Sequence, residues 1–246
     1  MHLLSSRSLL ALAFVMGFLP FYANLSAQEQ TGDIPLPDLP GEVITALRDA
    51  QVALSVPDLA QAREHLNKAM AVAGDDERVL SLHGALLTYE RNFDEARAVY
   101  LKLLQKQPDN FAPMWNLAEI DFLEGNYASS RQRFQKLQED RPRDEFLIYK
   151  ITLTYLFENK LEQAQQELDK IPFPSDTAAY YWGRGAIQLH LGNKAEGMRW
   201  LNEAGQIFRL QQTLLFADSL IEKGMITRAD VSGLVEIPAN QSNQVQ

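Results

Sequence analysis

Residues Phe111–Asp144 decide the fold of this chain; they read FAPMWNLAEIDFLEGNYASSRQRFQKLQEDRPRD. Two segments long enough for helices flank Gly125-Asn126, a pair typical of turns. Pro142 lies where the second segment must end, because proline cannot continue a helix. Apolar or small residues of the second segment are spaced by four and then three, which places them on one helical face: Ser130, Phe134 and Leu137. The stretch therefore predicts a helix–turn–helix unit.

The same pattern occurs five times along the chain. Its lines begin at Val43, Glu77, Phe111, Glu145 and Ala178, with steps of 34, 34, 34 and 33 residues. The twentieth column is small in every line, which lets two helices approach closely: Ala62, Ala96, Ser130, Ala164 and Gly197. Four and seven residues later come two further columns that are apolar throughout. They read Leu66, Tyr100, Phe134, Leu168 and Leu201, then Ala69, Leu103, Leu137, Ile171 and Ala204.

The column directly after the small one is long: Arg63, Arg97, Arg131, Gln165 and Met198. A shift of one residue therefore destroys the agreement between lines. This contrast predicts that Arg97 can be replaced by Leu at little cost, whereas a large residue at Ala164 would overpack the core. In the fourth line, Ile171-Pro172-Phe173-Pro174 is predicted to break the second helix.

The pattern resembles that of the tetratricopeptide repeat (TPR) family, a 34-residue helix–turn–helix repeat. The line from Phe111 matches it best, with Leu117, Ala118, Gly125-Asn126-Tyr127, Ser130, Phe134 and Pro142. The resemblance implies an all-α, right-handed superhelical solenoid of about five repeats over residues 43–210. Residues 211–232 would form one or more capping helices: Leu214–Leu220 resembles the first helix of a sixth unit, and Thr227 could start another short helix.

The first residues of the chain are typical of an export signal. Arg7 precedes an apolar run of about twelve residues, from Ser8 to Leu19, which is shorter than the roughly 20 needed to span a bilayer. We expect cleavage after Leu25-Ser26-Ala27, so that residues 1–27 are a signal peptide and the body is periplasmic or otherwise exported. The alternative is a retained membrane anchor. Residues 28–42 are predicted to be a proline-rich linker, and 233–246 a flexible tail.

Composition excludes several classes of function. A net charge of −9 argues against nucleic acid, since neutralising phosphates needs a basic surface. The chain has no Cys and four scattered His, so we expect no metal site and no cofactor. The usual phosphate-loop, zinc-hydrolase and nucleophile-elbow motifs do not occur, which predicts that the protein is not an enzyme. Glu64-His65 is interpreted as a solvated pair, and His83 as a packed, hydrogen-bonded histidine.

Aromatic residues follow one face of the predicted first helices. The fifth column of the last three lines reads Trp115, Tyr149 and Trp182, and the same face adds Phe122 and Phe157. The family resemblance places this face on the concave groove of the superhelix, where these five residues are predicted to bind a peptide. The alternative is that the rings pack against neighbouring helices as core.

These observations predict a non-catalytic, exported scaffold that binds a protein or peptide segment, in cell-envelope assembly or secretion. The alternative is a membrane-tethered structural subunit of an envelope complex, with the N-terminal segment retained. Only in that second case is contact with a membrane expected.

Overall fold

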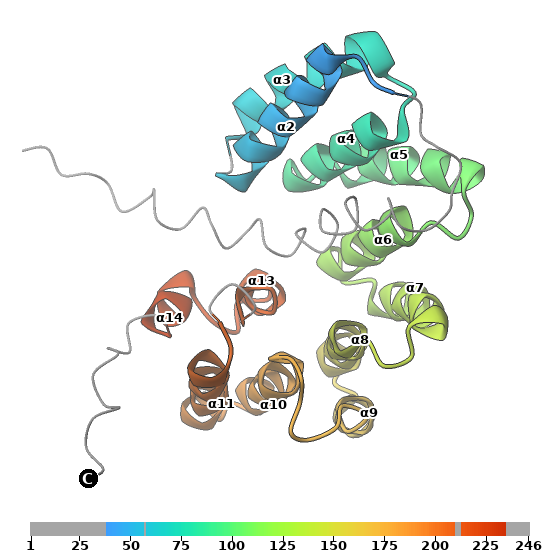
Figure 1. Ribbon diagram of the computed structural model, residues 1–246. Helices are drawn as coiled ribbons and strands as arrows, with labels where there is room; N and C mark the ends of the chain where they lie inside the picture. Colours follow the sequence, from blue (N-terminus) through green and yellow to red (C-terminus); the bar gives the residue numbers. More distant parts are fainter. Residues whose placement is uncertain (1–37, 57, 210–212, 235–246) are drawn as a thin grey trace, which may run out of the picture. The chain divides into compact units, whose positions relative to one another are not determined.

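The computed structural model describes residues 38–56, 58–209 and 213–234, and all regular secondary structure within these ranges is α-helical (Figure 1). The all-α prediction is thus confirmed. The chain divides into two compact units, Met1–Arg141 and Pro142–Gln246. The predicted signal peptide, residues 28–37 of the predicted linker and residues 235–246 of the predicted tail lie outside the described residues.

Unit 1 contains three helical hairpins. The two helices of each hairpin pack against each other, and α3 and α5 also pack against the first helix of the next hairpin. Their bounds are α2 Gly41–Ser55, α3 Leu59–Ala73, α4 Glu77–Tyr89, α5 Phe93–Lys106, α6 Phe111–Leu123 and α7 Tyr127–Asp140. These correspond to the first three predicted repeats, although α2 begins two residues before Val43.

Unit 2 contains the two remaining hairpins and two short C-terminal helices. Helix α10 packs against α11, its own hairpin partner, and against α8 and α9 of the preceding hairpin. The bounds are α8 Glu145–Phe157, α9 Leu161–Leu168, α10 Ala179–His190, α11 Lys194–Ile207, α13 Ala217–Glu222 and α14 Arg228–Gly233. None of the described helices combines the length and the apolar character needed to cross a bilayer.

Each first helix from the second repeat onward ends at a residue with left-handed backbone. The four residues occupy the same column of the repeat, with φ between 59° and 84°: Arg91, Gly125, Asn159 and Gly192. At Gly125 and Gly192 this conformation carries no steric cost, because glycine lacks a Cβ. The next residue's N–H then bonds back to the helix, as from Asn126 to the Asp121 carbonyl at 2.8 Å. The repeat thus turns at the same place in each hairpin.

The small column brings paired helices close together, as predicted. All five of its members are buried. A Cβ added to Gly197 would lie 3.1 Å from the carbonyl oxygen of Gly185, so α10 and α11 approach almost backbone to backbone. The Ser130 hydroxyl donates a hydrogen bond of 2.8 Å to the Ala118 carbonyl and so satisfies its polar group inside the same kind of contact.

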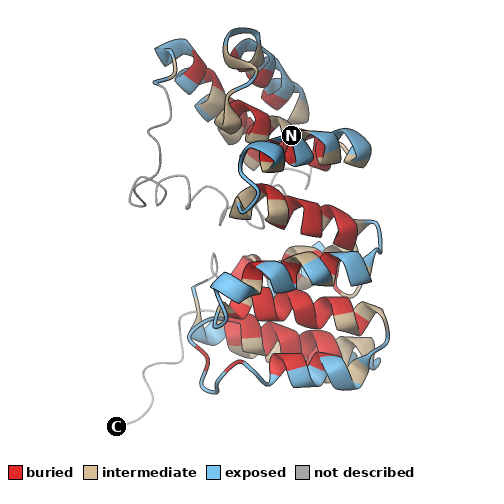
Figure 2. Cartoon of the chain, turned by 90° about the vertical axis from the view of Figure 1, so that its right-hand side faces the viewer, coloured by how far each residue is buried: buried red, intermediate tan, exposed pale blue. Residues whose placement is uncertain are grey.

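The two apolar columns that follow are buried too, so the predicted core is confirmed. The larger of them is at most 1% exposed in every repeat: Leu66, Tyr100, Phe134, Leu168 and Leu201. Figure 2 shows the buried residues gathered where the helices of each unit face one another, with exposed residues on the outer turns.

The predicted break in the fourth repeat is confirmed, since α9 ends at Leu168 after only eight residues. The loop that replaces its last turns is tied to the start of α8 by one buried carboxylate. Glu145 Oε2 accepts hydrogen bonds from the Ser175 hydroxyl at 2.8 Å and from the Thr177 N–H at 3.1 Å. Because Glu145 is buried, these donors replace the water that its carboxylate loses.

Replacing Ala164 by Leu should destabilise unit 2 by about 1–3 kcal/mol, because three extra carbons must fit into a contact that is already closed. Gln165→Leu is the matched control: that side chain is exposed and should tolerate the change. The measurement is urea denaturation followed by circular dichroism. Equal midpoints for the two variants would show that the register of the repeat is wrong at this position.

Candidate binding site

The five residues predicted to bind a peptide are divided between the two units. Trp115 and Phe122 lie on α6 of unit 1, whereas Tyr149 and Phe157 on α8 and Trp182 on α10 belong to unit 2. Four of the five are buried, and Phe157 is half-buried. That a partner touches them therefore stays a prediction, and what covers each ring becomes the relevant question.

In unit 1 the predicted rings pack within their own hairpin. The Trp115 ring lies 5.9 Å from the Phe111 ring and meets the Phe134 ring of α7 edge-on at 5.0 Å. Phe122 meets Tyr127, the first residue of α7, edge-on at 5.5 Å. Such aromatic pairs stabilise a core beyond their buried area. The two side chains thus join α6 to α7 rather than form an open wall.

In unit 2 the predicted rings are covered by a residue from the C-terminal part of the chain. Phe216, which directly precedes α13, meets Tyr149 edge-on with 5.0 Å between ring centroids and stacks on Trp182 at 6.4 Å. It also meets Phe146 edge-on at 5.2 Å. Phe216 is itself only 4% exposed, so its ring is inserted among these three.

Two hydrogen bonds hold the same segment in place. The Tyr149 hydroxyl donates to the backbone carbonyl of Phe216 at 2.8 Å, and the Lys150 ammonium donates to the Ser219 hydroxyl at 2.7 Å. Both Tyr149 and Lys150 are buried. A backbone carbonyl and a side chain three residues later are therefore recognised together, which fixes the position of the segment along α8.

The end of α13 completes the contact. The Lys223 ammonium lies 5.9 Å from the centre of the Phe157 ring, within the range of a cation–π interaction. All three predicted residues of unit 2 thus contact one stretch of chain. We call residues 213–223 the docked segment, and name as the docking face the side chains that hold it: Phe146, Tyr149, Lys150, Phe157 and Trp182.

The docked segment does not simply continue the stack of repeats. A sixth repeat would pack on the fifth, whereas Phe216 and Ser219 contact α8, the first helix of the fourth repeat, across 67 and 69 residues of sequence. Figure 1 shows α13 beside α8 and α10, on the side away from α9. The face on which the sequence predicted a bound peptide thus carries a segment of polypeptide, and that segment is the chain's own.

Sequence reasoning missed Phe216 and Ser219 as contact residues, although it identified Leu214–Leu220 as resembling one further helix. The available signal was that no second helix follows in register, so the stretch had no hairpin partner of its own. The short helix expected at Thr227 is confirmed: Thr227 and Asp230 form a reciprocal capping box at the start of α14.

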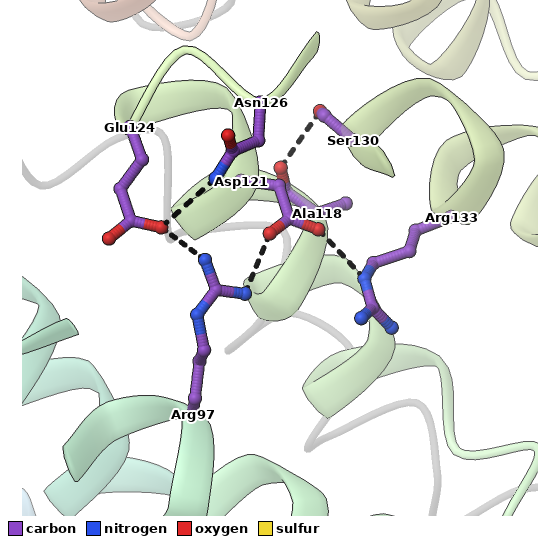
Figure 3. A network of polar contacts seen from close by, with 7 residues as sticks. All are labelled: Arg97, Ala118, Asp121, Glu124, Asn126, Ser130 and Arg133. Carbon is purple, nitrogen blue, oxygen red and sulfur yellow. Dashed lines mark hydrogen bonds and ion pairs between the residues drawn. The ribbon is translucent and has the colours of Figure 1, made fainter. Parts of the chain in front are cut away.

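Unit 1 contains a buried ion-pair network centred on Asp121 of α6 (Figure 3). Its carboxylate accepts from Arg97 Nη1 of α5 at 2.6 Å and from Arg133 Nε of α7 at 2.9 Å. The second Nη of Arg97 pairs with Glu124, which also accepts from Asn126. The Asp121 side chain is only 4% exposed. One carboxylate therefore joins the second repeat to both helices of the third.

The prediction that Arg97 can be replaced at little cost is wrong, because its guanidinium compensates this buried charge. The same column carries a weaker version one repeat earlier, where Arg63 pairs with Glu90 and is itself 47% exposed. Arg63 and Arg97 are 34 residues apart, and so are Glu90 and Glu124. This matching period of opposite charges was the signal in the sequence that could have revealed the pairing.

The side chains considered for chemistry have structural surroundings. Glu64 is exposed and pairs with Lys68 at 2.8 Å, and this hydrogen bond lowers the pKa of Glu64. His83 is half-buried on α4, and that burial lowers its pKa, helped by the charge of Arg63; its hydrogen bond stays a prediction. Within the described ranges, no group of three or more His, Asp or Glu is placed to hold a metal ion.

Comparison with known proteins identifies the repeat. Residues 87–152 match the model of a tetratricopeptide repeat family. That range begins near the end of α4 and extends into α8, so it contains the whole of the best-matching sequence line. Among curated proteins, no sequence matches this chain.

Three solved structures share the fold at low sequence identity. PilW, described as a type IV pilus biogenesis factor, aligns with a TM-score of 0.55 at 15% identity over 87% of this chain and 99% of its own. A fragment of MamA from Desulfovibrio magneticus gives 0.53 at 15% over 69% and 97%. A tetratricopeptide repeat protein from Parabacteroides merdae gives 0.52 at 19% over 80% and 78%. With its 34-residue period, paired helices and small interhelical column, the chain is a tetratricopeptide repeat protein.

Proposed function

We propose that this protein is an exported, non-catalytic scaffold that binds a protein or peptide segment on the inner face of its repeats. The observation that carries the proposal is the docking face, which holds eleven residues of polypeptide by an inserted ring, a bond to a backbone carbonyl and a bond to a side-chain hydroxyl. These are the means by which helical repeats recognise extended or helical peptides.

The compartment is inferred from the N-terminal sequence. Residues 1–27 are typical of a signal peptide, so we propose a periplasmic or otherwise exported location and a role in cell-envelope assembly or secretion. The likeness to PilW concerns the fold, and its pilus role is compatible with this proposal. The intact mass of protein purified from its host should correspond to a chain that begins at Gln28. A full-length chain in the membrane pellet would instead favour the tethered structural subunit.

Site-specific photo-crosslinking tests the binding role. A photoreactive phenylalanine analogue replaces Phe157, at the rim of the docking face, or Gln165, an exposed residue of α9. In the native host we expect a discrete crosslinked species from position 157 and none from position 165. Lys150→Glu should abolish it, because the ammonium that donates to the bound segment is replaced by a carboxylate. Equal crosslinking from both positions, or none from either, would contradict the proposal.

A further inference from the structure

The docked segment has little structure of its own to hold it in place. Helix α13 has six residues, and Phe216 at its start provides no side-chain cap. Isolated helices of this length are unstable in water, so the segment owes its conformation to the docking face. By contrast, α10 and α11 are long and approach at Gly185 and Gly197, within a hairpin that needs nothing else to close.

The fit between the segment and the docking face is incomplete. The indole N–H of Trp182 is buried, yet no acceptor for it is found among the described residues. A buried donor without an acceptor costs free energy that a better-matched occupant would recover. The chain's own segment therefore fills the ring position without using every polar group that surrounds it.

We propose that the docked segment is a displaceable, autoinhibitory occupant of the docking face. This inference rests on the proposed function and specifies its regulation. The partner it implies is a short helical segment with an aromatic side chain in the place of Phe216, and with a hydroxyl or other acceptor for Lys150 three residues later. An acceptor that also reaches Trp182 Nε1 favours the partner over the chain's own segment.

The tether gives the chain's own segment a large advantage. A segment joined by a short connection competes at an effective concentration of about millimolar. The affinity for an external segment falls by the fraction of molecules that are open. Weakening the internal contact should therefore strengthen external binding, a sign that a purely structural cap does not produce.

The test uses a fluorescein-labelled synthetic peptide with the sequence of residues 213–223 and the full chain purified from its host. Fluorescence anisotropy should show that the Phe216→Ala chain binds the peptide at least tenfold more tightly than the wild type. A peptide carrying the same Phe→Ala change should not bind. Phe208→Ala is the matched control, because Phe208 contacts Tyr181 outside the docking face and its loss should leave peptide affinity at the wild-type value.

Hydrogen exchange on the wild-type chain keeps the test decisive if Phe216→Ala fails to fold. We expect the amides of α13 to exchange through an opening that leaves α8 and α10 protected. Exchange of all three helices at one common rate would overturn the proposal, as would equal peptide affinity of the wild type and Phe216→Ala. A concentration-dependent dimer in light scattering would also overturn it, by assigning the docked segment to a second copy.

Failure of this inference can be told apart from failure of the proposed function. The peptide and exchange measurements use only the chain's own sequence, whereas crosslinking from position 157 reports an external partner. Crosslinking without enhanced peptide binding would retain the scaffold and remove the autoinhibition. Enhanced peptide binding without any crosslink would show a displaceable segment and leave the scaffold role unsupported.

Discussion

Replacing Trp182 by Ala should lower the free energy of unfolding of unit 2 by about 3–5 kcal/mol, the cost of removing a large aromatic side chain from a core. The ring is fully buried and stacks on Phe216. Its loss therefore leaves a cavity between α10 and the docked segment. Urea denaturation followed by circular dichroism measures the effect.

Trp200→Ala provides the matched control, because the residue removed is the same and the site is only half-buried. Trp200 lies among Tyr180 and Tyr181 near the surface of α11. We expect less than half the loss caused by Trp182→Ala, since less apolar area returns to water. If both variants melted at the same urea concentration, Trp182 would not be the core residue that its burial indicates.

This expectation reverses the one that the sequence favours. A ring at the fifth column of a repeat, read as part of an open groove, predicts that Tyr149 and Trp182 can be replaced with little change in melting. The reversal has a single physical cause. Phe216 covers both rings, and it lies 67 residues from Tyr149 in the sequence. No periodicity of 34 residues contains a contact of that kind.

Features set by local chemistry could be predicted from the sequence. Gly125 and Gly192 stand where the backbone must be left-handed, and Ala96 and Ala164 stand where helices approach closely. The break before Pro172 shortens α9 as expected. Each of these depends on residues within one hairpin, so one line of the repeat contains the information.

The candidate site was predictable only in part, for the same reason. Tyr149, Phe157 and Trp182 do lie together on a face that contacts a polypeptide segment, as their shared column indicates. The occupant was not predictable, because Phe216 and Ser219 follow the last repeat and belong to no column. Asp121 was also missed: its column does not repeat the charge, and its role depends on Arg97 and Arg133 from two other helices.

Replacing Arg97 by Leu should destabilise unit 1 by about 3 kcal/mol, near the lower end of what breaking a buried ion pair costs. Asp121 is almost fully buried and loses one of its two guanidinium partners in this variant. Arg63→Leu is the matched control in the same column: Arg63 is 47% exposed, so its loss should cost below about 1 kcal/mol. Urea denaturation compares the two.

A second substitution separates lost attraction from stranded charge. If the penalty of Arg97→Leu arises because the Asp121 carboxylate is left buried with too little compensation, then adding Asp121→Leu removes the cause. The double variant should be more stable than Arg97→Leu alone, because Arg133 is 35% exposed and can turn to solvent. A further loss of stability in the double variant would show instead that Asp121 acts through Arg133, with Arg97 contributing packing by its methylene groups.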